Sequence, residues 1–176
     1  MNIKTALLEE HSKAQALRIS EYIGTSAERF DELMQCFFAD DWRTNQCAAY
    51  TLNHVVDQQP ALFAPYVEKS IENLKTPKHD AVKRNTLRIF QYYDVPEKLQ
   101  GVLVDLAFNF LASPKEPIAV RVFSMNVIFN VAKKEPDLLH ELKILIEEGM
   151  PNGSAGFKSR GRKILAYIDK VFPEEY

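Results

Sequence analysis

Apolar side chains recur along this chain with the spacing of one α-helix face, and the pattern occurs in four copies. Each copy is centred on a small residue, with mostly apolar positions four residues before it and three, four and seven residues after it. Such offsets follow one face of an α-helix. The central residues, named the anchors below, are Cys47, Thr86, Ser124 and Gly161. They lie about 38 residues apart, which predicts a helical repeat.

A small anchor allows a neighbouring helix to approach closely. Gly161 is the sharpest case, because a glycine inside a helix costs about 1 kcal/mol relative to alanine unless packing uses the missing side chain. A second helix accompanies each copy, and three of these helices are expected to begin at Pro60, Pro96 and Pro136. Proline suits the first turn, where its missing N–H would be unpaired in any case. The unit is therefore helix–turn–helix.

These units predict an all-α fold, an α–α superhelix of about four helix–turn–helix repeats with a leading N-terminal helix over residues 3–22. We expect nine helices and no strand, with helix over about four fifths of the residues. The 176 residues, 46% of them hydrophobic, are enough for one continuous core. A single domain over residues 1–176 is the expected organisation.

The composition narrows the function only slightly. The net charge of −2 predicts no strong general attraction to nucleic acid or to a membrane. Cys36 and Cys47 are isolated on predicted helices and are interpreted as reduced core thiols. The first residues carry Lys, Glu and His, so no signal peptide is expected, and the location is predicted to be cytoplasmic.

The chain resembles HEAT and armadillo-type repeat proteins over residues 26–172. The likeness consists of the period, the prolines before the outer helices, and the openings Val82-Lys83-Arg84 and Val120-Arg121-Val122. HEAT repeats usually carry Asp in the turn within a repeat and Arg or Lys a few residues later. Asp41 with Arg43 and Asp80 with Lys83 keep both residues, whereas Arg121 and Lys158 lack the acid.

The resemblance implies that the second helix of each pair lines a concave surface. Polar and aromatic residues follow the anchors there in a stripe: Asn53, Arg84, Arg88, Tyr92, Asn126, Asn130, Lys163 and Tyr167. Asn is a poor helix former, so its recurrence hints at a role beyond solvation. One interpretation is an ordinary solvated helix face. The other is a groove that binds a protein or peptide.

A basic cluster offers an alternative function. Lys158, Arg160 and Arg162 stand near the start of the last predicted helix and are candidate phosphate contacts, or else a solvated terminal cap. HEAT-like DNA alkylation-repair glycosylases use a basic concave face with Trp and Asp. Trp42 follows Asp40 and Asp41 here, although a lone tryptophan is usually part of the core. Nucleic-acid binding or DNA repair is thus the second hypothesis, which the net acidity disfavours.

Residues that could carry catalysis form no recognisable set. The four histidines never pair at i, i+4 on one helix, so no metal site is expected, and His54 is interpreted as a hydrogen-bonded core residue. No Ser-His-Asp or Cys-His arrangement can be drawn. The chain is therefore expected to be a non-enzymatic scaffold without a cofactor, and an enzyme of unknown class is the third, unsupported hypothesis.

Overall fold

The computed structural model describes residues 1–77 and 79–173, and every regular element in those ranges is helical. They contain ten α-helices and one 3₁₀ helix, where nine helices were expected. Helix covers 76% of the described residues, so the all-α repeat class predicted from the anchors is confirmed. The chain divides into two compact units, Met1–Val95 and Pro96–Tyr176.

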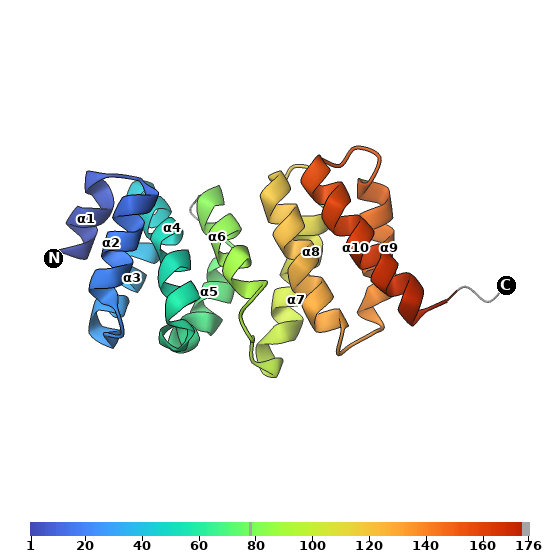
Figure 1. The fold of residues 1–176 in the computed structure, drawn as a ribbon, viewed down its shortest axis with the longest axis horizontal. Coiled ribbons are helices and arrows are strands. Elements are labelled where there is room, and N and C mark those ends of the chain that lie inside the picture. The colour runs from blue at the N-terminus through green and yellow to red at the C-terminus, as the bar shows by residue number, and fades with distance from the viewer. Residues whose placement is uncertain (78, 174–176) are drawn as a thin grey trace. The chain divides into compact units, whose positions relative to one another are not determined.

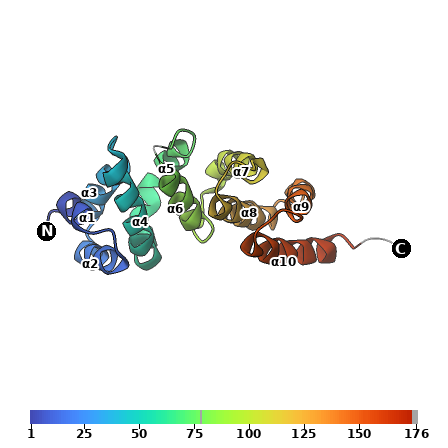
Figure 2. The same ribbon diagram turned by 90° about the horizontal axis from the view of Figure 1, so that it is seen from above.

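The first unit arranges its helices in two layers. Its elements are α1 (Ile3–Glu9), α2 (Lys13–Ile23), α3 (Ala27–Phe37), α4 (Trp42–Gln58), the 3₁₀ helix η1 (Pro60–Tyr66), α5 (Val67–Asn73) and α6 (Asp80–Phe90). Figure 1 shows their order along the chain, and Figure 2 shows α2, α4 and α6 on one side with α3 and α5 on the other. Helix α1 packs against α2, α3 and α4.

The second unit repeats this two-layer plan. Its helices are α7 (Glu97–Ala112), α8 (Ile118–Ala132), α9 (Leu138–Gly149) and α10 (Ala155–Val171). Within this unit, α8 and α10 lie on one side and α7 and α9 on the other (Figure 2). Below, α2, α4, α6, α8 and α10 are named the second helices, and α1, α3, η1 with α5, α7 and α9 the first helices.

The anchors lie where the layers meet, as the sequence predicted. Cys47, Thr86 and Ser124 are at most 2% exposed, and Gly161 is buried as well. A Cβ atom on Gly161 would lie 2.9 Å from Ile146 Cγ2 of α9. Real Cβ atoms do not tolerate that distance, so the close approach of α9 and α10 that the glycine predicted is confirmed.

Large aromatic side chains fill the core of the first unit. Phe63 of η1 is fully buried, and its ring centre lies 6.0 Å from that of Phe90 on α6 and 5.4 Å from that of Tyr93. Burial of one such side chain contributes about 1.5–3 kcal/mol. The repeat pattern therefore places apolar residues where they bridge successive elements.

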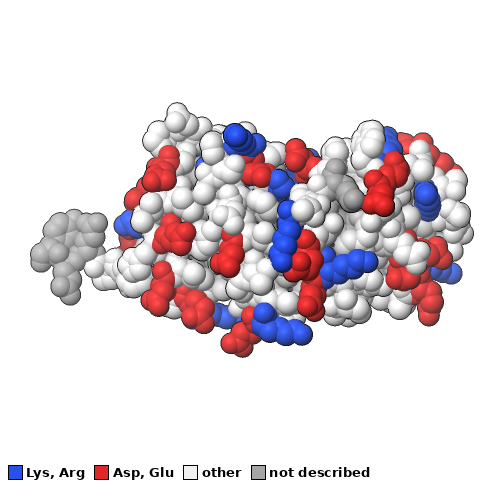
Figure 3. Space-filling model, turned by 180° about the vertical axis from the view of Figure 1, so that it is seen from behind, with Lys and Arg blue, Asp and Glu red and all other residues white. Residues whose placement is uncertain are grey.

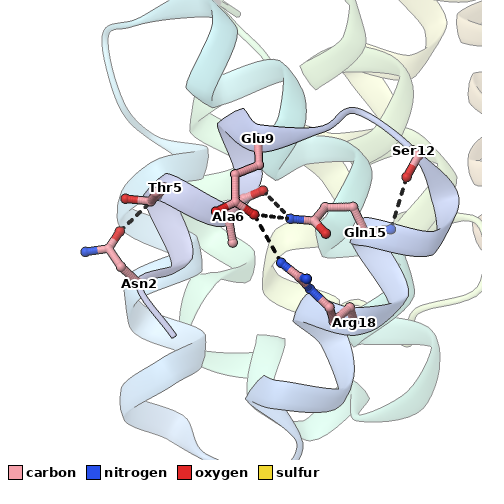
Figure 4. Close-up of polar contacts among 7 residues, drawn as sticks. All are labelled: Asn2, Thr5, Ala6, Glu9, Ser12, Gln15 and Arg18. Carbon is pink, nitrogen blue, oxygen red and sulfur yellow. Dashed lines mark hydrogen bonds and ion pairs between the residues drawn. The ribbon is translucent and has the colours of Figure 1, made fainter.

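The leading segment differs from the single helix expected over residues 3–22. It forms α1 and α2, and the break falls at Glu10–Ser12, where the Ser12 hydroxyl accepts the N–H of Gln15 and caps α2. The Gln15 side chain donates a 2.6 Å hydrogen bond to the carbonyl oxygen of Ala6 and so ties α2 to α1 (Figure 4). In one continuous helix the buried residues Ile3, Ala6 and Leu7 would lie on the side opposite to Ala16, Ile19 and Ile23, so the break allows both sets to reach the core.

The element beginning at Pro60 also differs in detail. It starts as the 3₁₀ helix η1 and becomes α-helical only from Val67. Pro65 lies inside η1 and has no N–H to offer to an i−4 carbonyl, so the α-helical ladder cannot form through that position. Pro60 thus begins the segment, as predicted, and Pro65 makes its first two turns 3₁₀-helical instead of α-helical.

Candidate functional site

Charge is divided between the two helix layers of each unit. In Met1–Val95 the second helices carry six Lys or Arg and three Asp or Glu. The first helices of this unit carry three Lys or Arg and six Asp or Glu. In the other unit the second helices carry six Lys or Arg and one Asp, and the first helices carry two Lys and five Asp or Glu. Figure 3 looks onto the side opposite to that of Figure 1, where Asp and Glu recur. The net charge of −2 conceals this division.

A cavity of about 230 Å³ opens among the second helices of the first unit. Residues from α2, α4 and α6 line it: Lys13, Tyr50, Asn53, His54, Asn85 and Arg88. These are two cations, two amides and two rings, and none is acidic. The lining therefore offers mainly hydrogen-bond donors and positive charge.

Arg88 is held in place by two residues of α4. Its Nη1 donates to Asn53 Oδ1 over 2.8 Å, and its Nη2 donates to Asp57 Oδ2 over 3.1 Å. Asn53 in turn donates from Nδ2 to the carbonyl oxygen of Ala49 over 3.0 Å. Asn53 and Asp57 are one turn apart, so they present their oxygens on the same side of α4. The guanidinium thus has a defined orientation before any ligand arrives.

Three rings stand in series beside the cavity. The ring centres of His11 and Tyr50 are 5.3 Å apart, and those of Tyr50 and His54 are 5.2 Å apart. His11 lies in the turn between α1 and α2, and the other two rings lie on α4. The series connects the rim of the cavity with the break in the leading segment.

Burial and the Lys and Arg side chains of α2, α4 and α6 lower the pKa values of His11 and His54. Burial lowers the pKa of His11 below its usual value, and the charges of Arg43 and Arg84 lower it further. Burial also lowers the pKa of His54, with Arg88 and Lys13 adding to the effect and Asp57 opposing it. Both imidazoles are therefore mainly neutral at pH 7, and the local potential is positive.

The eight stripe residues divide between the units and differ in exposure. Asn53 and Asn126 are only 3% and 7% exposed, so neither forms part of a solvated stripe as expected. Asn53 is occupied in orienting Arg88. Arg84 and Tyr92 are exposed, and Arg88 is partly exposed at the rim of the cavity.

The stripe residues of the second unit lie on α8 and α10. Asn130 and Lys163 are exposed, and Asn130 Oδ1 accepts a 3.4 Å hydrogen bond from Lys133. Tyr167 is half-buried and packs edge-on against Phe129, with ring centres 5.0 Å apart. Tyr167 therefore also holds α10 against α8. A role of the stripe in partner binding stays a prediction.

The basic cluster and the tryptophan lie in different units. Lys158, Arg160 and Arg162 lie on α10, and because they are spaced by two residues, Arg160 points away from the side that the other two share. Trp42 begins α4 and is 54% exposed, not part of the core, with its ring stacked on His79 at 5.8 Å. The cluster and the tryptophan therefore belong to different compact units.

Sequence reasoning missed several residues of the cavity. The repeat pattern does not mark Lys13, Tyr50 or Asn85 as site residues, and it predicts a core position for His54, which instead lines the cavity. The excess of Lys and Arg on alternate helices is visible in the sequence and could have indicated this face. Which cations surround the cavity is decided by the packing of α2, α4 and α6.

Two further features bear on the kind of site. Within the described ranges, no group of three His, Cys, Asp or Glu side chains is placed to hold a metal ion. No helix in the part of the chain that the structure describes is long and apolar enough to cross a bilayer.

Comparison with known proteins identifies the repeat. The HEAT repeat domain family matches residues 3–168, which is nearly the whole chain. No curated protein and no solved structure matches it. The match covers both layers of helices and all four anchors. With its buried small residues and paired helices, the chain belongs to the HEAT repeat family.

Proposed function

We propose that this protein is a non-catalytic scaffold that binds an acidic segment of another protein or peptide through the second helices of residues 1–95. The observation that carries the proposal is the division of charge, with Lys and Arg in excess on α2, α4 and α6. HEAT repeats commonly bind proteins, which supports a scaffold role. The family match does not identify the partner.

Electrostatics explains how such a face would select its partner. Arg43 and Arg84 are exposed on α4 and α6, and Lys13 and Arg88 lie at the cavity beside them. Complementary potentials raise association rates and exclude partners of like charge. An acidic segment is therefore favoured over a neutral or basic one.

Nucleic-acid binding or DNA repair is the alternative, supported by Lys158, Arg160 and Arg162 on α10 with Lys163 beside them. A duplex requires several phosphate contacts, and its affinity falls steeply as salt is added. The net charge of −2 disfavours a polyanion that must be contacted at many phosphates. We therefore place the acidic protein segment first.

The two free, buried cysteines support a reducing compartment such as the cytoplasm.

A selection from a random peptide library displayed on phage tests the proposal. We expect recovered peptides to be enriched in Asp and Glu, and the enrichment to vanish with Arg43→Glu plus Arg84→Glu. The matched control is Lys98→Glu plus Lys115→Glu, which makes the same change of charge at exposed positions outside the second helices. Selection without acidic enrichment, or equal loss with the control, would contradict the proposal.

Fluorescence anisotropy with labelled duplex and single-stranded DNA at low salt tests the alternative. If DNA binds there and the affinity depends on Lys158 and Arg162, nucleic acid replaces the peptide as the preferred ligand. If no DNA binds at low salt, the alternative is removed, because low salt is the condition most favourable to phosphate contacts.

A further inference from the structure

We propose that the cavity among α2, α4 and α6 binds one carboxylate group of the acidic partner segment, with Arg88 and Lys13 as its cationic contacts. The inference rests on the proposed function and names the group that would be recognised. It concerns the six residues that line the cavity, not the exposed face around them.

The size and lining of the cavity suit a small anionic group. About 230 Å³ is many times the roughly 10–15 Å³ that one water molecule needs, so a carboxylate and the methylene groups that carry it can enter. Asn53 and Asn85 are buried at 3% and 5% exposure, so they present fixed amides and not mobile ones. Lys13 stands at the start of α2 and contributes a flexible ammonium group.

Arg88 is prepared to receive an anion. The guanidinium has five N–H groups, and the bonds to Asn53 and Asp57 use one on each terminal nitrogen. The remaining N–H groups are held in a fixed plane by these two bonds. A ligand that binds there does not have to order the side chain first, which is a cost that usually weakens binding.

The structure already shows this guanidinium holding a carboxylate. Asp57 Oδ2 accepts from Nη2 over 3.1 Å, with its side chain 48% exposed. A second carboxylate would approach from the cavity, where none of the lining residues is acidic.

Binding should be linked to a proton on His54. The groups that act on this imidazole are Arg88 of α6, Lys13 of α2 and Asp57 of α4, and the two cations help to keep its pKa low. A bound carboxylate offsets those cations and makes protonation easier. Binding therefore takes up a proton, and affinity should rise as pH falls from 7.5 to 6.0, a range where the carboxylates of Glu stay ionised.

The test is an NMR titration of the protein with an acetylated, amidated hexaglutamate peptide. In a buffer without carboxylate or phosphate, we expect the Arg88 Nε–H and the Asn85 side-chain amide signals to shift. Arg88→Gln should weaken binding at least tenfold, as loss of a charge-assisted contact implies. Arg88 also joins α4 to α6, so Arg88→Gln can weaken binding by disturbing the fold, and two further variants therefore accompany it.

Lys13→Gln and Asp57→Asn change the charge of the cavity in opposite directions. Lys13 is exposed at the first position of α2, and its replacement should weaken binding about threefold. Asp57→Asn removes a competing carboxylate and should strengthen binding about threefold, which a loss of folding cannot imitate. His54→Gln should abolish the rise of affinity between pH 7.5 and 6.0.

The outcomes separate this inference from the proposed function. Unchanged affinity with both Lys13→Gln and Arg88→Gln, while Arg43→Glu plus Arg84→Glu still abolishes binding, overturns the cavity and leaves the face. Tighter binding of inorganic phosphate than of the peptide overturns the assignment to a carboxylate. No shift of the Arg88 or Asn85 signals at saturating peptide also overturns it, whatever the phage selection yields.

Discussion

The hydroxyl of Tyr66 donates a 2.9 Å hydrogen bond to Asp31 Oδ1 and so joins η1 to α3 across two repeats. Burial and this bond raise the pKa of Tyr66 to about 12. The bond connects residues far apart in the sequence and is therefore a feature of the tertiary fold. The same ring packs edge-on against Phe30, with centres 5.5 Å apart.

We predict that Tyr66→Phe lowers the free energy of unfolding by about 1 kcal/mol, because the ring contact remains and only the hydrogen bond is lost. Chemical denaturation at pH 7 measures this. Tyr92→Phe is the matched control, since that ring is 77% exposed and should change little. Equal effects of the two variants would contradict a stabilising bond to Asp31.

The same bond predicts a loss of stability in alkali. The folded pKa of Tyr66 lies above the unfolded value near 10, so its contribution is complete below pH 10 and is lost as pH rises towards 12. We expect the stability difference between the protein and Tyr66→Phe to shrink over that range. A constant difference from pH 9 to pH 11.5 would count against it.

Two glycines inside helices of the second unit should respond in opposite ways. A side chain at Gly161 meets Ile146 and Met150, so Gly161→Leu should cost about 1–3 kcal/mol through overpacking. Gly101 on α7 has nothing within 4 Å of an added Cβ, so Gly101→Ala should stabilise by about 0.5–1 kcal/mol. Thermal melts compare them, and a neutral Gly161→Leu would mean that α9 and α10 do not pack as described.

Asn45 closes the end of α3 from the neighbouring helix. It is fully buried on α4, and its Nδ2 donates to the carbonyl oxygen of Phe37, the last residue of α3. Asn45→Ala should cost about 1–3 kcal/mol, because a buried carbonyl loses its partner. Asn109→Ala, at an exposed position of α7, is the control. Urea denaturation measures the free energy of unfolding of both variants. Equal losses in the two would mean that the hydrogen bond from Asn45 to Phe37 is not the cause.

The histidines of the first unit predict a stability that falls in acid. The pKa values of His11 and His54 are lowered in the folded state, so below pH 6.5 the unfolded chain binds more protons than the folded one. Stability should therefore decrease as pH falls through and below 6.5. His11→Gln plus His54→Gln should flatten that slope in denaturation curves from pH 7.5 to 5.5. His140→Gln on α9 is the control, and an unchanged slope in the double variant would refute the assignment.

The periodic residues made much of the fold predictable. The anchors Thr86, Ser124 and Gly161 are buried because two helices can pack closely only where side chains are small. A small residue at such a position can be recognised in the sequence. Helix identity and the repeat follow from apolar spacing, since burial of one face is the dominant stabilising term. These properties are local and recur, so the sequence alone determined them.

Tertiary structure decided the site. Asn53 was expected in a solvated stripe but is buried, since Arg88 from the next second helix folds over α4 to reach it. His54 was expected in the core but lines a cavity, because α2 and α6 leave space beside it. Contacts of this kind depend on side chains more than 30 residues apart, and on how closely their helices approach. Helical spacing reports which face of a helix a residue occupies, whereas only the packed neighbours determine what that residue touches.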